Sequence, residues 1–421
     1  MIARHEVPLA AEDAARLHMS MAENPMLITA LLLLDRPIGF DELASRLARR
    51  LARHPRFRQV VIEPRLGLGM PHWRDDPTFD VAHHVHHIDV ALLPGAPSLD
   101  EVVGDLSTIP LARQRPLWRV HLIDGRQPAV MVVVHHALAD GATLLALLHE
   151  LVDEEATTLH DERERPATLS GRAWKVAAGT LAAVRFAARR ADPPSPLKGR
   201  MTERKHLAFS PPLPLERLRS IAQGVQMSVT GLLLAAVTGA CRAELARNGS
   251  PDGLVLHALV PMRLEARPGI GNQYGSALVP LPVGTADLAA RIRQVRGTAR
   301  ALRSRRAGLA GARLAAAGGA LSAAVERLGV SFFSRRASVA VSSVRGPTSP
   351  FHLCGAAVRD VLVWAPASGT IALSITLMSY AGNARIGVAA DGHVVGSARR
   401  VVAELQSEIA TIATFASGAR A

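Results

Sequence analysis

The sequence predicts an α/β protein in which mixed β-sheets are flanked by helices. Three observations support this fold class. Short apolar runs rich in valine and leucine, typical of buried strands, alternate with segments in which leucine recurs at helical spacing. Hydrophobic residues make up 48% of the chain and charged residues 20%, as in globular proteins with a large core. The length of 421 residues is enough for about two to three domains.

The elements of the first half follow from these patterns. The apolar runs at residues 27–34 and 129–134 predict strands, the second of them buried on both faces. Leucines at helical spacing predict helices over residues 41–54 and 99–109 and after Gly141. A charged stretch then ends a first domain, predicted to cover residues 1–165. A linker helix and a proline-rich connection are predicted at 166–205.

The second domain is predicted to cover residues 206–421. Its helices are expected at 215–223, 230–248 and 288–328 and from Ala398 onward, and its strands at 255–260, 276–283, 338–343 and 371–378. The last strand alternates large apolar side chains with small or polar ones, so one face belongs to a core and the other packs or lines a tunnel. The uncharged stretch 361–384 is long enough to span a bilayer. It contains proline, serine and glycine, so we predict strand, turn and strand instead.

The charge balance is strongly basic, with 49 basic and 36 acidic residues and a formal net charge of +13. All but three of the basic residues are arginines, a bias that indicates a GC-rich genome rather than nucleic-acid binding. Aromatic residues form only 4% of the chain, which leaves few side chains to stack on bases. We therefore expect no nucleic-acid partner. The charge favours phospholipid surfaces or phosphate-bearing substrates.

Location is predicted from cysteine use and from the N-terminal segment. Cys241 and Cys354 are the only cysteines, which excludes a CxxC-type metal site and fits a reducing compartment. No apolar stretch follows a basic start, so we expect no signal peptide and a cytoplasmic protein. Basic amphipathic segments at 174–190 and 291–313 fit peripheral contact with the inner face of the plasma membrane. Both patterns are also typical of solvated helix faces.

The strongest motif is VMVVVHHALADG at residues 130–141. A buried strand ends at His135 and His136, and Asp140 and Gly141 open a helix. A histidine held at the end of a rigid strand is a candidate general base near neutral pH. An alternative is purely structural, because Asp140 stands where a helix N-cap belongs and strand-end histidines are often hydrogen-bonded core residues.

The segment HHALADG at 135–141 has the HHxxxDG form shared by CoA-dependent acyltransferases and peptide-synthetase condensation domains. Other segments narrow the resemblance: FDVAHHVHHIDVALLPGAP at 79–97, RPLWRVHLIDG at 115–125, LVPMR at 259–263, GNQYGSALVPLP at 271–282, SSVRGP at 342–347 and ALSITLMSYAGNARIGVAAD at 372–391. In this order they resemble the wax ester synthase/diacylglycerol acyltransferase family. The resemblance covers nearly the whole chain.

The resemblance implies an O-acyltransferase with two chloramphenicol-acetyltransferase-like domains and an active-site tunnel between them. It implies that His136 deprotonates the acceptor hydroxyl, which then attacks the thioester of an acyl-CoA. His135 matches the first histidine of the motif, and Asp140 matches the aspartate that holds the loop geometry. Gly141 is expected to allow close approach of the backbone.

The same resemblance assigns substrate-binding residues. Pro116, Leu117 and Trp118 match the PLW motif and are expected to shape the acyl side of the site. Asn272 matches an asparagine that either forms a turn or contacts the oxyanion. No cofactor is expected, because acyl-CoA is a co-substrate. The acceptor is a diacylglycerol or a long-chain alcohol, and contact with an anionic membrane or a lipid droplet is expected.

Some positions depart from the family pattern, among them Thr230 and Gly231 at a helix start. They leave two alternatives open: a transferase that uses a carrier-protein thioester or an unusual acceptor, and a catalytically silent lipid-binding homologue. The cluster of His83, His84, His86 and His87 invites a metal site. No carboxylate or cysteine is spaced to complete one, so no metal is expected.

Overall fold

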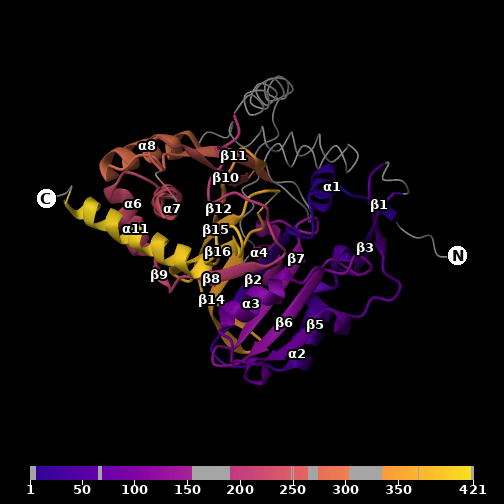
Figure 1. Cartoon of the computed structure of the whole chain (residues 1–421). Helices are drawn as coiled ribbons and strands as arrows, with labels where there is room; N and C mark the ends of the chain where they lie inside the picture. Colours follow the sequence, from indigo (N-terminus) through magenta and orange to yellow (C-terminus); the bar gives the residue numbers. More distant parts are fainter. Residues whose placement is uncertain are drawn as a thin grey trace, which may run out of the picture.

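The computed structural model describes residues 6–64, 69–153, 190–247, 249, 251–263, 274–302, 334–367 and 369–418. Two large sheets organise these residues, and a small sheet packs beside the first (Figure 1). The small sheet has the order β1-β4-β3, formed by β1 (Glu6–Pro8), β4 (His72–Asp75) and β3 (Gln59–Ile62). The large sheets pack their apolar faces against helices. The hydrophobic core therefore lies in layers between sheets and helices.

The first large sheet has the order β13-β14-β2-β7-β6-β5, and only the β5–β6 pair is parallel among its described pairs. Its strands are β2 (Leu27–Leu34), β5 (Val85–Asp89), β6 (Trp118–Asp124), β7 (Ala129–His135), β13 (His352–Leu353) and β14 (Ala356–Trp364). The helices of this half are α1 (Ala11–His18), α2 (Phe40–Arg46), α3 (Leu99–Thr108) and α4 (Gly141–Leu151). The predicted strand at 27–34 is confirmed.

The second large sheet has the order β11-β10-β12-β15-β16-β8, and β9 pairs with β16. Its strands are β8 (Lys205–Phe209), β9 (Leu213–Pro214), β10 (Leu256–Arg263), β11 (Tyr274–Leu281), β12 (Val339–Arg345), β15 (Leu373–Tyr380) and β16 (Asn383–Asp391). The helices beside it are α6 (Leu215–Gly224), α7 (Val229–Ala246), α8 (Leu288–Leu302) and α11 (Ala398–Gly418). The sheet is mixed, because β10–β12 and β12–β15 are parallel pairs.

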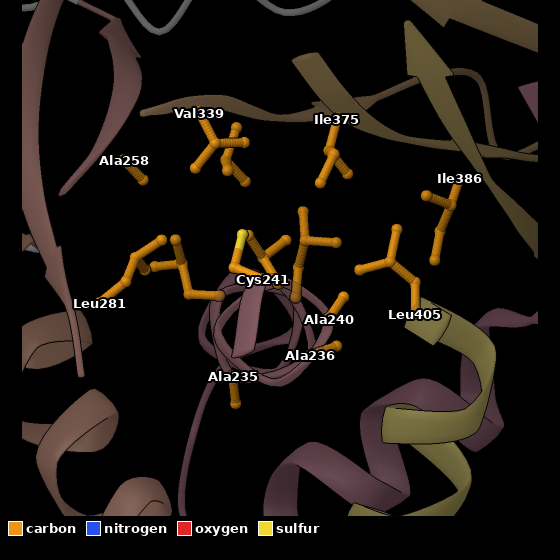
Figure 2. Packing of buried hydrophobic residues seen from close by; sticks show 14 of the residues in the cluster. Ala235, Ala236, Ala240, Cys241, Ala258, Leu281, Val339, Ile375, Ile386 and Leu405 are labelled. Carbon is orange, nitrogen blue, oxygen red and sulfur yellow. The ribbon is translucent and has the colours of Figure 1, made fainter. Parts of the chain in front are cut away.

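Helix α7 forms the centre of the second core. Figure 2 shows Ala240 and Cys241 on the side of α7 that faces side chains from several strands, with Leu405 of α11 beside them, while Ala235 points away from the strands. Its length and composition would suit a membrane span, but 72% of its apolar window is buried inside the fold. An apolar helix that is mostly buried inside the fold is a core helix.

The two halves of the chain are joined by more than the linker. The β13–β14 hairpin belongs to the predicted second domain, residues 206–421, yet it completes the first sheet beside β2. Strand alternation alone does not indicate which sheet a strand enters, so the sequence did not predict this crossover. Pairing with β14 gives hydrogen-bond partners to the backbone groups on the second edge of β2. These partners are needed because β2 is buried along its whole length.

Three buried contacts tie the crossover to the second half. The Tyr380 hydroxyl, at the end of β15, accepts from the Phe351 N–H at 2.9 Å and donates to the Val358 carbonyl at 2.9 Å. Asp360 of β14 forms an ion pair with Arg385 of β16 at 2.6 Å. The Trp364 indole donates to the Ala208 carbonyl of β8 at 3.2 Å.

The helix predicted over residues 41–54 is shorter and changes form. Helix α2 ends at Arg46 and continues as a π-helical segment, Leu47–Leu51. Such segments are frequent at functional sites. Here the segment lies beside α4, and Arg46 and Arg50 from this region donate to the last carbonyls of α4.

Replacing Tyr380 with phenylalanine is expected to destabilise the fold. Tyr380 is 2% exposed, and Tyr380→Phe leaves a buried N–H and a buried carbonyl without this partner, at a cost of about 2 kcal/mol. Urea denaturation followed by circular dichroism measures the change in the free energy of unfolding. Thr414→Val, which removes an exposed hydroxyl, is the control and should change stability by less than about 0.5 kcal/mol. Equal stability of the two variants would contradict the crossover role of Tyr380.

Candidate active site

The turn after β7 holds the two adjacent histidines. The His135 N–H donates to the Leu117 carbonyl at 3.0 Å, and the His136 N–H donates to the Met26 carbonyl at 2.8 Å. These carbonyls precede β6 and β2, the two strands that flank β7. The Leu138 N–H then donates back to the His135 carbonyl at 2.8 Å, which closes the turn. Both histidine backbones are therefore fixed from either side.

His135 is a buried, neutral residue of the sheet. It is 3% exposed and lies opposite Leu27 in the β2–β7 ladder. Its Nδ1 accepts from the Ala137 N–H at 3.0 Å, so the ring proton is placed on Nε2. Burial, the charge of Arg113 and the neighbouring His136 lower the pKa of His135 from 6.5 to about 3. The imidazole therefore carries no charge at physiological pH.

His136 is the first residue after the strand and is 6% exposed. Its position differs from that of His135, because it lies outside the strand ladder and its backbone is tied to Met26. Met26 has a φ of 52°, in the left-handed region that is unusual for a side-chain-bearing residue. Backbone strain of this kind persists where the surroundings enforce it and is common at functional sites.

Asp140 is the N-cap of α4, as the structural alternative predicted. Its Oδ1 accepts from the Thr143 N–H at 2.8 Å, and its carbonyl accepts from the Leu144 N–H at 2.8 Å. It is 5% exposed. This geometry agrees with a role in holding the loop. At Gly141, a Cβ would meet no described atom within 4 Å, so the described chain gives no close backbone approach there. A role for Gly141 toward substrate stays a prediction.

The far end of α4 is also held in place. Arg46 donates to the Leu151 carbonyl at 3.1 Å, and Arg50 donates to the carbonyls of Glu150 at 3.0 Å and Val152 at 2.5 Å. Arginine at a helix C-terminus satisfies carbonyls that lack intrahelical partners and complements the helix dipole. The helix that begins at the histidine turn is thus capped at both ends.

The PLW residues lie in the core of the first half. Leu117 and Trp118 are 0% and 1% exposed, and the Trp118 ring stacks on His84 with centroids 4.3 Å apart. The Trp118 indole donates to the Phe57 carbonyl at 2.8 Å. Pro116 is buried as well. Their described link to the histidine turn is the Leu117 carbonyl, so contact with an acyl chain stays a prediction.

Two further predictions have different outcomes. Asn272 lies outside the described residues. The four clustered histidines are spread over separate environments: His83 is exposed, His84 is buried against Trp118, His87 faces Asp124 at 2.7 Å, and His86 lies beside His121. Among the described residues, no three His, Cys, Asp or Glu side chains gather in a way that could hold a metal ion.

A pocket of ≈ 60 Å³ lies between the two large sheets, and we call it the inter-sheet pocket. Neither His135 nor His136 is among its lining residues, and its link to the histidine turn is Leu27, the ladder partner of His135. Its lining residues come from both halves: Asn24, Pro25, Leu27, Thr29, Ser107, Met201, Lys205, Leu207, Trp364, Ala365, Pro366, Ala367, Ile371, Ala372, Ser374, Ala389 and Asp391. The small-residue face predicted for the strand near 371–378 contributes Ala372 and Ser374. The full tunnel stays a prediction.

Sequence reasoning missed Asn24, Lys205 and Asp391. Lys205 and Asp391 lie far apart in sequence, and no linear pattern joins them. The Asn24-Pro25 dipeptide is a turn signal directly before the strand Leu27–Leu34. It could have identified the turn but not the pocket that the turn lines.

Together, the two-sheet fold and the histidine turn define a protein of the HHxxxDG acyltransferase class. A wax ester synthase/diacylglycerol acyltransferase from Marinobacter aquaeolei VT8 has a similar structure, with a TM-score of 0.71 and 22% identity over 98% of this chain and 100% of that one. The first condensation domain of the calcium-dependent antibiotic synthetase is similar too, with a TM-score of 0.64 and 17% identity over 99% of this chain and 96% of that one. Both likenesses confirm the predicted fold class.

The sequence comparisons then identify the family. The model of the wax ester synthase/diacylglycerol acyltransferase catalytic domain matches residues 9–189, and the model of the family's C-terminal domain matches residues 270–413. A Mycobacterium tuberculosis protein named as a diacylglycerol O-acyltransferase is 30% identical over 88% of this chain and 84% of its own length. Another from that organism, tgs1, is 28% identical over 96% and 93%. The chain belongs to this family, which confirms the predicted family and acyltransferase class.

The low pKa of His135 predicts a pH-dependent stability. Below pH 6.5 the unfolded chain binds a proton at this position, while the folded chain stays neutral down to about pH 3. Stability is therefore lost as the pH falls, by about 2 kcal/mol between pH 7 and pH 5. In His135→Asn, which keeps an acceptor for the Ala137 N–H, this part of the loss should vanish.

Urea denaturation of both proteins at pH 7 and pH 5 measures the difference. Because the other titrating groups are shared, the comparison isolates position 135. A variant that loses as much stability as the parent would show that His135 titrates normally in the folded chain.

Proposed function

We propose that this chain transfers a fatty acyl group from acyl-CoA to the hydroxyl of a diacylglycerol or a long-chain alcohol, with His136 as general base. The observation that carries the proposal is the histidine turn, in which backbone groups beside two strands fix His136 next to His135, whose ladder partner Leu27 lines the pocket between the sheets. Membership of the family supports acyl transfer to a lipid hydroxyl. The names of the mycobacterial relatives support diacylglycerol as one acceptor.

In this mechanism, His136 takes the proton of the acceptor hydroxyl while the oxygen attacks the thioester carbonyl carbon. The tetrahedral intermediate then expels CoA by breaking the carbon–sulfur bond. The thiolate leaves as the thiol by taking the proton back from His136, so no cofactor is needed. A buried base favours this chemistry, because exclusion of water limits hydrolysis of the thioester.

The neighbouring residues prepare His136 for this role. His135 stays neutral, so it adds no positive charge that would oppose protonation of His136 during the reaction. Asp140 caps α4 and fixes the end of the turn. These two residues act on geometry and electrostatics, while the proton transfer belongs to His136.

Loss of the base should reduce the rate by about 10²–10⁴. Thiol release from palmitoyl-CoA is measured with a long-chain alcohol, with a diacylglycerol and without acceptor, for the parent and for His136→Ala. Acceptor-dependent release that falls in the variant is expected. If a folded His136→Ala variant still releases thiol at the parent rate, His136 is not the base. If the parent protein releases no thiol with any acceptor, the proposed acyl-CoA reaction is contradicted.

We also propose a cytoplasmic protein in peripheral contact with an anionic membrane or lipid droplet, supported by the net charge of +13. Residues 174–189 of the segment 174–190 lie outside the described residues. Within the segment 291–313, Arg291 is buried against Glu408 at 3.0 Å, so this arginine is not available to contact a membrane.

Co-sedimentation of the protein with liposomes should rise with their content of anionic lipid and fall with salt. Binding that ignores lipid charge would contradict the proposal.

A further inference from the structure

Among the polar groups that line the inter-sheet pocket, the Asn24 carboxamide has a buried donor that the described chain leaves unused. Asn24 is 5% exposed and lines the pocket, and its amide nitrogen Nδ2 is buried without a hydrogen-bond partner among the described residues. A buried donor left unpaired costs about 1–3 kcal/mol. Such a group in a native fold calls for an explanation, and a bound ligand oxygen supplies one.

The position of Asn24 is rigid and close to the reacting residues. Its backbone N–H and carbonyl are both paired with Met21, at 3.0 Å and 3.1 Å. Two residues later, the Met26 carbonyl holds the His136 N–H at 2.8 Å. Leu27 follows as the ladder partner of His135. One short segment therefore connects the unpaired amide to both histidines.

The charged groups of the pocket are already satisfied by each other. Lys205 donates to Asp391 at 2.8 Å and to the Thr202 carbonyl at 2.8 Å. Asp391 is 0% exposed and also accepts from the backbone N–H groups of Thr202, His393 and Val394. Burial raises the pKa of Asp391, but the bonds to Lys205 and Thr202 outweigh this and hold it below its usual value. The pair is ionised and contributes no net charge.

The rest of the wall is mostly apolar, with Leu27, Leu207, Trp364 and Ile371 among its residues, and it also includes the hydroxyls of Thr29, Ser107 and Ser374. A wall without net charge does not suit a phosphate, which requires cationic partners. It suits a neutral oxygen attached to a lipid-like group. The volume of ≈ 60 Å³ exceeds the roughly 10–15 Å³ that one water molecule requires on the same measure. The pocket therefore has room for a functional group of a substrate.

We propose that the inter-sheet pocket binds a neutral carbonyl oxygen of a substrate and that the Asn24 carboxamide donates a hydrogen bond to it. The proposal rests on the acyl-transfer function above and deepens it. Two substrates supply this chemistry: diacylglycerol through an ester carbonyl, or acyl-CoA through its thioester carbonyl or an amide carbonyl of the pantetheine arm. A long-chain alcohol has no carbonyl oxygen. If the ester carbonyl is the group that binds, Asn24 therefore contributes to the binding of diacylglycerol and not to that of the alcohol.

Asn24→Leu tests this proposal because it keeps the approximate size of the side chain and removes the donor. The loss of one neutral hydrogen bond should raise the relevant KM about threefold to tenfold. The melting temperature should stay equal or rise, because the variant no longer buries an unpaired donor. A residue with only a structural role would show the opposite pattern, with stability lost and KM unchanged. If Asn24→Leu does not fold, Asn24→Ala serves for the same comparison.

The experiment has two arms. In the first, KM is measured for dioctanoylglycerol and for hexadecanol at saturating palmitoyl-CoA. An increase for dioctanoylglycerol alone assigns the ester carbonyl. In the second, KM for palmitoyl-CoA is measured at saturating hexadecanol, and an increase there assigns a carbonyl of acyl-CoA. Weaker binding of free CoA, which has no thioester, then assigns the pantetheine amide. Gln223→Leu, the same kind of change on the exposed face of α6, is the control and should leave every KM unchanged.

Binding without turnover separates this proposal from the function itself. Trp364 lines the pocket, so tryptophan fluorescence reports titration with dioctanoylglycerol or with CoA. Weaker binding of one of these to Asn24→Leu supports the pocket even if no acyl transfer is detected. Unchanged KM values together with unchanged binding of both probes would overturn the proposal, whatever the activity of the parent protein.

Discussion

The entry of β14 into the first sheet is the constraint on which the arrangement of the two halves depends. Because β14 is hydrogen-bonded to β2 along most of its length, the second half cannot turn away without breaking a sheet. The buried Asp360–Arg385 pair and the Trp364 indole then fix the angle between the sheets. The inter-sheet pocket exists because these contacts hold the two sheets close but not in full contact.

The histidine turn illustrates how backbone groups prepare a reactive side chain. Its conformation is set by main-chain hydrogen bonds to Leu117 and Met26, which belong to the segments leading into the flanking strands. The strongly shifted pKa of His135 and the cap made by Asp140 are consequences of burial and helix geometry. The motif is therefore largely a device for orientation, and the proton transfer proposed above is assigned to His136 alone.

Local elements of this fold could be predicted from the sequence, while their partners could not. The apolar run Leu27–Leu34 and the helix that starts at Gly141 are visible as patterns, because periodicity reports burial. Periodicity does not report which strand lies alongside, so the crossover of β14 was missed. The π-helical segment Leu47–Leu51 preserves the apolar spacing of an ordinary helix and leaves no separate trace in the sequence.

The same distinction between local patterns and distant contacts applies to the candidate site. The histidine turn was predicted because strand, loop and helix follow each other directly in the chain. The pocket beside it was not, because Asn24, Lys205 and Asp391 meet only after the two sheets pack. The assignment of Leu117 and Trp118 to the acyl side came from family resemblance alone, and the structure places both in the core. Asn272 lies outside the described residues, so its role stays a prediction.

The crossover also has a consequence for how the protein is made. Strand β2 is apolar on both faces, and its second edge is covered only by residues that follow it by more than three hundred positions in the chain. During synthesis, the first half leaves the ribosome with this edge unpaired. An exposed apolar edge strand is a template for pairing with other chains. The nascent protein must therefore be shielded, or delayed in folding, until its last third has been translated.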